Sequence, residues 1–242
     1  LLSLKYDHED VARTLLLSGA DVHAKSSRGN TILHLVCEEG SKDKVKFLLE
    51  NGAIISRTNQ QSQNCLFSSV KHSQVLNYLI EHLKANGQFR KQLLLGKDDQ
   101  TRTVLHYCCE TGSVDSLNLL LRVMGPTSAW NEAEELFGNT PLHLAAIRNN
   151  FECVKCLVES QQVNIDVVNF AGKSPLHLAI ENNFAQIAMY LQNEAKAAWT
   201  LPPNTRVLYS VNFDQMKGDL KQLWTKEMGE KFLQAIGEDV HI

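Results

Sequence analysis

Cysteine and histidine are the residue types in this sequence that could hold a metal or carry nucleophilic chemistry, and the chain has six cysteines and nine histidines. Cys153 and Cys156 have the Cys-x-x-Cys spacing of zinc and redox sites, but the sequence contains no second such pair. On the helix that we expect here, both lie on the buried face. Buried free cysteine packs as a small hydrophobic residue in a reducing compartment. The pattern therefore favours core cysteines over a metal or redox centre.

Four of the nine histidines belong to one recurring phrase. Its copies are Thr-Pro-Leu-His-Leu-Ala-Ala at 140–146, Ser-Pro-Leu-His-Leu-Ala-Ile at 174–180, Thr-Ile-Leu-His-Leu-Val-Cys at 31–37, Thr-Val-Leu-His-Tyr-Cys-Cys at 103–109 and the weaker Asn-Cys-Leu-Phe-Ser-Ser-Val at 64–70. His143 and His177 are 34 residues apart, and Phe67 takes the histidine position 33 residues after His34. A fixed period of this size indicates stacked repeats.

Each residue type in the phrase has a physical role. Thr or Ser before Pro supplies an N-cap oxygen, and Pro fits the first helical turn because its missing N–H would be unsatisfied there in any case. The leucines face the core, and small residues such as Ala145 and Ala146 let a neighbouring helix approach closely. We expect the histidine to bond backbone groups of neighbouring turns as a fixed polar staple. This role is favoured over catalysis or metal binding.

The phrase resembles the ankyrin repeat, whose signature is Thr-Pro-Leu-His-x-Ala at a period near 33, a turn followed by two antiparallel helices. The resemblance implies an all-α fold, a solenoid of stacked helix-turn-helix units with short β-hairpin fingers and a C-terminal helical cap. We expect an array over 1–198, with repeats at about 1–24, 25–57, 58–96, 97–133, 134–167 and 168–198. Residues 199–242 are expected to form a cap or degenerate repeat, with a partner-docking module as the alternative.

Three irregularities interrupt the array. The first repeat is truncated, so we expect the natural protein to continue upstream. The third copy lacks both the proline and the histidine, and residues 84–95 after it are expected to extend the outer helix or to form an extra turn. A second insertion, at 125–132, lies where we expect a hairpin finger and contains Trp130.

Composition and motifs argue against several functions. With 24 Lys and Arg against 27 Asp and Glu, the net charge of −3 gives no electrostatic reason to expect nucleic acid or an anionic membrane. The sequence has no apolar run long enough to insert into a membrane, no phosphate-binding glycine loop and no nucleophile elbow. The remaining histidines share no local motif: His8, His23, His72, His82 and His241. We therefore expect no enzyme, no cofactor and no metal, and a location in the cytoplasm or nucleus.

The resemblance also implies where a partner would bind, because ankyrin arrays bind other proteins through finger tips and exposed inner-helix positions. These positions lie seven, six and four residues before the histidine and four and five after it. They are polar in the second to fourth repeats, which supply Gln100 and Arg102. The fifth and sixth repeats supply Leu136, Phe137, Asn139, Ile147, Arg148, Phe170 and Lys173.

Four large apolar residues in the last two sets stand where solvent is expected, next to Arg148 and Lys173. A hot spot needs such a cluster, and Trp130 on the insertion could reach the same partner. The alternative is that the insertion folds back and buries Leu136 and Phe137 under Trp130.

The sequence thus predicts a protein-interaction scaffold that binds another protein through its concave face and fingers, and that is monomeric on its own. The runner-up is a targeting or autoinhibitory domain of a larger multidomain enzyme or bacterial effector whose catalytic part lies outside this sequence. The full-length reading frame would distinguish the two.

Overall fold

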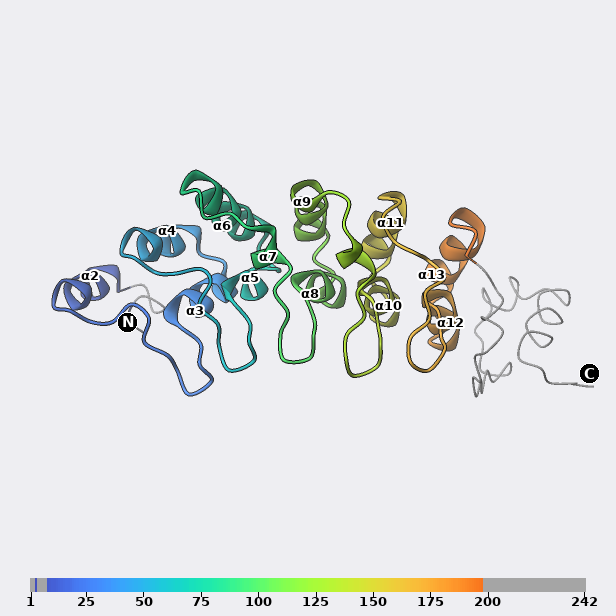
Figure 1. Cartoon of the computed structure of the whole chain (residues 1–242), viewed down its shortest axis with the longest axis horizontal. Coiled ribbons are helices and arrows are strands. Elements are labelled where there is room, and N and C mark those ends of the chain that lie inside the picture. The colour runs from blue at the N-terminus through green and yellow to red at the C-terminus, as the bar shows by residue number, and fades with distance from the viewer. Residues whose placement is uncertain (1–2, 4–7, 198–242) are drawn as a thin grey trace, which may run out of the picture. The chain divides into compact units, whose positions relative to one another are not determined.

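Each copy of the recurring phrase begins an inner helix. The computed structural model describes residue 3 and residues 8–197, and within them the fold is all-α, as expected (Figure 1). The inner helices are α3 (Ile32–Glu39), α5 (Cys65–Ser68), α8 (Val104–Thr111), α10 (Pro141–Ile147) and α12 (Pro175–Glu181). The small positions of the phrase are buried in the cores of the units, among them Cys37, Cys108, Ala145 and Ala179.

An outer helix follows each inner helix. The outer helices are α4 (Lys42–Glu50), α6 (Ser73–Ala85), α9 (Val114–Met124), α11 (Phe151–Glu159) and α13 (Ala185–Met189), which continues as a π-helical turn over Tyr190–Glu194. Helix α2 (Glu9–Leu17) belongs to the truncated first repeat. Every outer helix of more than eight residues buries one apolar stripe, which on α6 includes Leu76, Leu79 and Leu83.

The chain divides into two compact units. One unit is Leu1–Cys108 with Asp115–Gly125, and the other is Cys109–Val114 with Pro126–Ile242. In the first unit α3 packs against α4 and α5, and in the second α10 packs against α11 and α12. The expected cap at 199–242 lies outside the described residues, and the repeat boundaries and the single array over 1–198 stay predictions.

Short loops, here called fingers, precede the inner helices. They are the second (26–30), third (59–63), fourth (98–102), fifth (134–139) and sixth (169–173) fingers, numbered by repeat. In each, the backbone N–H of the first residue donates to the carbonyl of the last at 2.8–3.0 Å. In the part of the chain that the structure describes, β-type pairing is a single antiparallel bridge between Lys25 and Thr31. The expected β-hairpins are therefore tight turns with almost no paired strands.

The predicted histidine staple is confirmed at His143 and His34, each of which bonds its own N-cap residue and the next finger. The backbone N–H of Thr140 donates to His143 Nδ1 at 3.1 Å, and His143 Nε2 lies 3.0 Å from the carbonyl oxygen of Lys173 in the next finger. His34 bonds Thr31 and the carbonyl of Gln63 in the same way. Because a backbone N–H can only donate, Nδ1 is the acceptor and the Nε2–H tautomer bonds the next repeat. Burial lowers the pKa of His143 to about 4, so this neutral form is maintained.

The third repeat replaces the staple with other contacts. Asn64 caps α5 by accepting from Leu66 N, and its amide donates to the carbonyl of Leu93 at 3.2 Å. Leu93 lies in α7 (Lys91–Leu94), the extra turn that follows the long helix α6. Of the two alternatives expected for 84–95, the extra turn is confirmed as α7, whereas α6 extends into this segment only as far as Ala85.

The insertion at 125–132 is not a finger, and that expectation was wrong. It contains a 3₁₀ turn over Ser128–Asn131 that packs against α10, and Trp130 has no exposed surface. Burying an indole removes a large apolar area from water, which favours a segment folded onto the core over one that projects into solvent. The fifth finger is the loop that follows, 134–139.

We predict that His143→Ala lowers the free energy of unfolding by about 1–3 kcal/mol, because it leaves the Thr140 N–H and the Lys173 carbonyl without this partner. Urea denaturation measures the change. His23→Ala is the matched control, since His23 lies in a turn outside the inner helices, and it should cost much less. A change near zero at His143 would count against the staple.

The lowered pKa of His143 also predicts a pH dependence. Between its ordinary value of 6.5 and about 4, the unfolded chain binds a proton at this ring that the folded chain does not. The free energy of unfolding should therefore fall as the pH falls through this window, by at most about 3 kcal/mol from this residue. Urea midpoints at several pH values test this. The prediction fails if His143→Gln retains the full wild-type slope over the same range.

Candidate functional site

A side-chain acceptor at the start of each finger holds its turn in place. The Oδ1 of Asn169 accepts from the backbone N–H groups of Ala171 and Lys173, both at 3.0 Å. Asn59 and Asp98 make the same pair of bonds in the third and fourth fingers. These acceptors fix the loop before any partner binds, and sequence reasoning missed them. The sequence signal for them was an Asn or Asp eight residues before the histidine position of the repeat.

The fifth finger has one more residue than the others, and a longer side chain spans it. Glu134, itself buried, accepts from the backbone N–H groups of Leu136, Phe137 and Asn139 at 2.7, 2.8 and 3.1 Å. The tip that carries the two apolar residues is therefore closed by three charge-assisted bonds.

Leu136, Phe137 and Phe170 form an exposed group that we call the finger-tip patch. Their exposed fractions are 61%, 59% and 73%. The backbone N–H of Phe170 donates to the carbonyl of Phe137 at 2.9 Å, so adjacent fingers are joined at the patch. At Gly138, where φ is +71°, a Cβ would lie 2.5 Å from the Phe170 ring. Glycine at this position therefore permits both the turn and the placement of the ring.

Charged residues expected at the site are already paired. Lys173, which ends the sixth finger, contacts Glu181 at 2.6 Å. Arg148 contacts Glu110 at 2.6 Å, and Ile147 is half-buried at the end of α10. These pairs give the second unit a polar rim rather than a field of one sign.

Two expected contact residues face inward instead. Trp130 is fully buried, so it cannot reach a partner at the surface. Asn139 is also buried, and its Oδ1 accepts from the amide of Asn169 at 2.9 Å. Asn139 thus ties the fifth finger to the sixth. The alternative in which Trp130 covers Leu136 and Phe137 is wrong as well, because both stay exposed.

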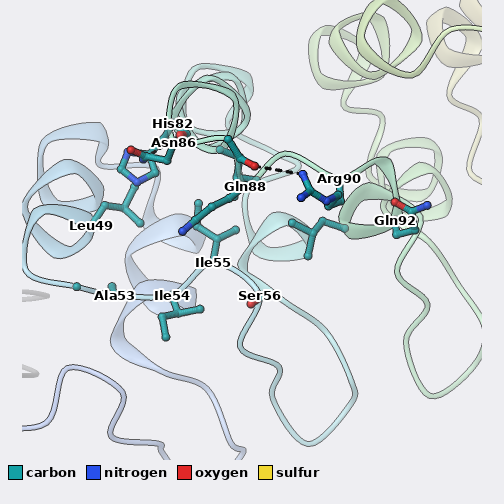
Figure 2. A pocket seen from close by; sticks show the side chains of 14 residues that line it. Leu49, Ala53, Ile54, Ile55, Ser56, His82, Asn86, Gln88, Arg90 and Gln92 are labelled. Carbon is teal, nitrogen blue, oxygen red and sulfur yellow. Dashed lines mark hydrogen bonds between the residues drawn. The ribbon is translucent and has the colours of Figure 1, made fainter.

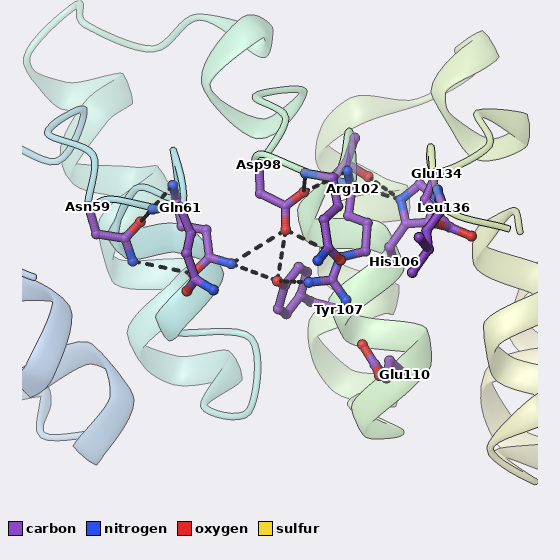
Figure 3. Close-up of polar contacts among 12 residues, drawn as sticks. Asn59, Gln61, Asp98, Arg102, His106, Tyr107, Glu110, Glu134 and Leu136 are labelled. Carbon is purple, nitrogen blue, oxygen red and sulfur yellow. Dashed lines mark hydrogen bonds and ion pairs between the residues drawn. The ribbon is translucent and has the colours of Figure 1, made fainter. Parts of the chain in front are cut away.

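Two further expected contact residues, Gln100 and Arg102, lie in the first unit and differ in how exposed they are. Gln100 is exposed, whereas Arg102 takes part in the cluster shown in Figure 3. The guanidinium of Arg102 contacts Asp98 at 3.2 Å and the hydroxyl of Tyr107 at 2.6 Å, and it stacks 4.6 Å from the Tyr107 ring centroid. The hydroxyl of Tyr107 donates to Asp98 at 2.8 Å. Arg102 therefore fixes the fourth finger and is only partly available to a partner.

The chain matches a model of ankyrin repeats, described as three copies, over residues 2–91 and 126–198. The chain belongs to the ankyrin repeat family. Ankyrin repeats are a non-enzymatic type of interaction domain, which supports a general role in binding other proteins.

Two of the relatives are proteins much longer than the region that this chain matches. The chain is 27% identical to Transient receptor potential cation channel subfamily A member 1 of Homo sapiens over 77% of its own length and 16% of the channel subunit. It is 27% identical to NF-kappa-B inhibitor cactus of Drosophila melanogaster over 90% of its length and 40% of cactus. It thus spans less than half of each. The crystal structure of the ankyrin repeat domain of Bcl-3 matches with a TM-score of 0.65 and 20% identity, over 80% of this chain and 82% of that one.

The ankyrin core accounts for the cysteines. None of the six forms a disulfide, and five are buried, whereas Cys156 is half-exposed despite its expected place on the buried face. Among residues 3 and 8–197, no group of three His, Cys, Asp or Glu side chains could hold a metal ion. No helix within those same residues has the length and hydrophobicity to cross a membrane.

Burial raises the pKa of Cys156 to about 11, which predicts slow alkylation of the native ankyrin array. The rate at Cys156 should rise about tenfold per pH unit between pH 7 and 9, because only the thiolate reacts. Peptide mapping after iodoacetamide treatment measures this, and Cys156→Ser should remove most native labelling. Rapid labelling at neutral pH would contradict the assignment. So would fast reaction at Cys153, which has no exposed surface.

Proposed function

We propose that this ankyrin array is a protein-binding scaffold and that a partner protein binds it on the finger-tip patch. The observation that carries the proposal is the exposure of Leu136, Phe137 and Phe170 at the tips of two adjacent fingers. Monomeric proteins rarely leave large apolar side chains together in water unless the patch has a binding role.

The rigidity of the patch supports the proposal. Three backbone groups of the fifth finger are bound by Glu134, and two of the sixth by Asn169. The two fingers are joined at Phe137 and Phe170. A partner that docks here meets side chains on a fixed backbone, so little loop entropy is lost on binding.

The surroundings of the patch also suit a hot spot. A central apolar group with a polar rim is the usual arrangement, and the pair of Lys173 and Glu181 provides such a rim on the sixth finger. Among the relatives, cactus is named as an inhibitor of another protein, NF-kappa-B, which supports partner binding as the general role. A role as a targeting or autoinhibitory part of a larger protein stays a prediction.

Replacing Phe137 and Phe170 by alanine should weaken partner binding by at least about 2 kcal/mol, roughly thirtyfold, because two desolvated anchors are lost. Partners are first identified by affinity purification and mass spectrometry with the wild-type chain as bait. The affinity of a purified partner is then measured by calorimetry for the wild-type chain and the double variant.

The control is Arg28→Ala with Gln60→Ala, two exposed finger residues of the first unit, which should change the affinity much less. Thermal melts of both double variants separate binding from folding. The patch assignment is wrong if the aromatic pair lowers the melting temperature sharply while the affinity per folded molecule is unchanged.

A further inference from the structure

The insertion at 84–95 creates a recess in the first unit that the proposed function does not use. The recess has a volume of about 790 Å³, within the range of ligand-binding pockets, and lies between the loop that follows α4 and the segment from the end of α6 into α7 (Figure 2). A regular repeat has no residues to form the second wall, because that wall is the inserted segment itself. Its larger aliphatic lining residues are Leu49, Ile54, Ile55, Leu83 and Leu93.

The apolar surface of the recess is concave rather than protruding. Leu49, Ile55 and Leu83 are buried, and Ile54 at the rim is 44% exposed. A recess with a buried aliphatic floor accepts a side chain inserted from outside, which is how anchor residues of binding partners are held. A bilayer surface, in contrast, would need apolar side chains that project.

Arg90 gives the recess a cationic rim. It is the only Lys or Arg among the lining residues, and none of those residues is acidic. Its Nη1 donates to the backbone carbonyls of Gly87 and Phe89 at 3.1 and 3.0 Å. These bonds hold the guanidinium in position while it remains exposed, so an incoming carboxylate meets a fixed donor.

The charge of the surrounding sequence points the same way. Residues 51–97 contain six Lys and Arg but one acidic residue, Glu81, in a chain whose net charge is −3. Glu81 is itself paired with Lys84 at 2.8 Å. An excess of positive charge in the segment that supplies every lining residue except Leu49 favours partners with acidic groups next to an apolar one.

We infer that this recess is a second docking site, separate from the finger-tip patch, for a linear segment of a partner protein. That segment carries one apolar side chain of leucine to phenylalanine size next to an aspartate or glutamate. The apolar side chain lies on Leu49, Ile55 and Leu83, and the carboxylate pairs with Arg90. The inference does not depend on the proposed function, because the two sites lie in different units of the chain.

The test begins with a displayed library of random short linear peptides. It is selected on the intact 242-residue chain and counter-selected on Arg90→Glu. We expect the recovered sequences to share an apolar residue beside an acidic one. A recovered peptide is then labelled, and its Kd is measured by fluorescence anisotropy.

Arg90→Glu should raise the Kd at least about tenfold, and Ile54→Ser at least about fivefold. Arg57→Glu is the matched control, since it removes a cation from the same basic region without lining the recess, and it should change the Kd less than about twofold. Phe137→Ala with Phe170→Ala should leave the Kd unchanged. Circular dichroism confirms that each variant is folded, and Ile54→Ser provides the test if Arg90→Glu is not.

Four outcomes would overturn the inference. The library yields no sequence that distinguishes the wild-type chain from Arg90→Glu, or its sequences lack acidic residues. Arg57→Glu weakens binding as much as Arg90→Glu, which would mean diffuse electrostatics. Alternatively, vesicles of phosphatidylcholine and phosphatidylserine sediment the wild-type chain but not Arg90→Glu while no peptide is enriched, which would make the face a membrane contact.

Discussion

The fold depends on a neutral, buried histidine that satisfies backbone groups of two consecutive repeats. His143 accepts from the N-cap residue of its own helix through Nδ1 and donates to Lys173 in the next finger through Nε2. Both backbone groups lie where water is scarce, and an unsatisfied group there would cost about as much as the bond contributes. The bond sets the position of the next finger relative to the inner helix.

The third repeat shows what replaces the staple when the histidine is lost. Phe67 packs edge-on against Tyr107 with ring centroids 5.3 Å apart, and the Tyr107 hydroxyl accepts from Gln63 and donates to Asp98. Asp98 at the same time caps its own finger and pairs with Arg102. The Phe67–Tyr107 ring contact and the hydrogen bond from Gln63 to Tyr107 thus join the third and fourth repeats, where His34 and His143 each use one imidazole. The exchange is costly to break, since removing Arg102 would leave a buried carboxylate without its counter-ion.

The sequence predicted the inner helices correctly, but it predicted which side chains are exposed only in part. The five copies of the recurring phrase predicted five inner helices, because helix caps, proline and leucine act within one helical turn. The copies could also be aligned with one another in the sequence. Trp130 was misplaced because the direction in which an inserted segment folds depends on the core that it meets, not on its own spacing. Asn139 was misassigned for a related reason. The equivalent position is half-buried at Asn30 and Lys173, and Asn139 is buried, with its side-chain oxygen accepting from Asn169.

Both proposed binding sites arise where the chain departs from its own repeat. The fifth finger has an extra residue, and a turn of that length needs an acceptor with a longer reach than aspartate or asparagine. Glu134 supplies the additional methylene and binds three N–H groups instead of two. The recess beside Arg90 likewise exists because an insertion adds a wall that no regular repeat has. Residues that maintain the repeat are already committed to helix caps, staples and core packing, so a substitution among them costs stability before it can change a partner. The inserted residues carry fewer of these duties, and for that reason specificity can change there without loss of the fold.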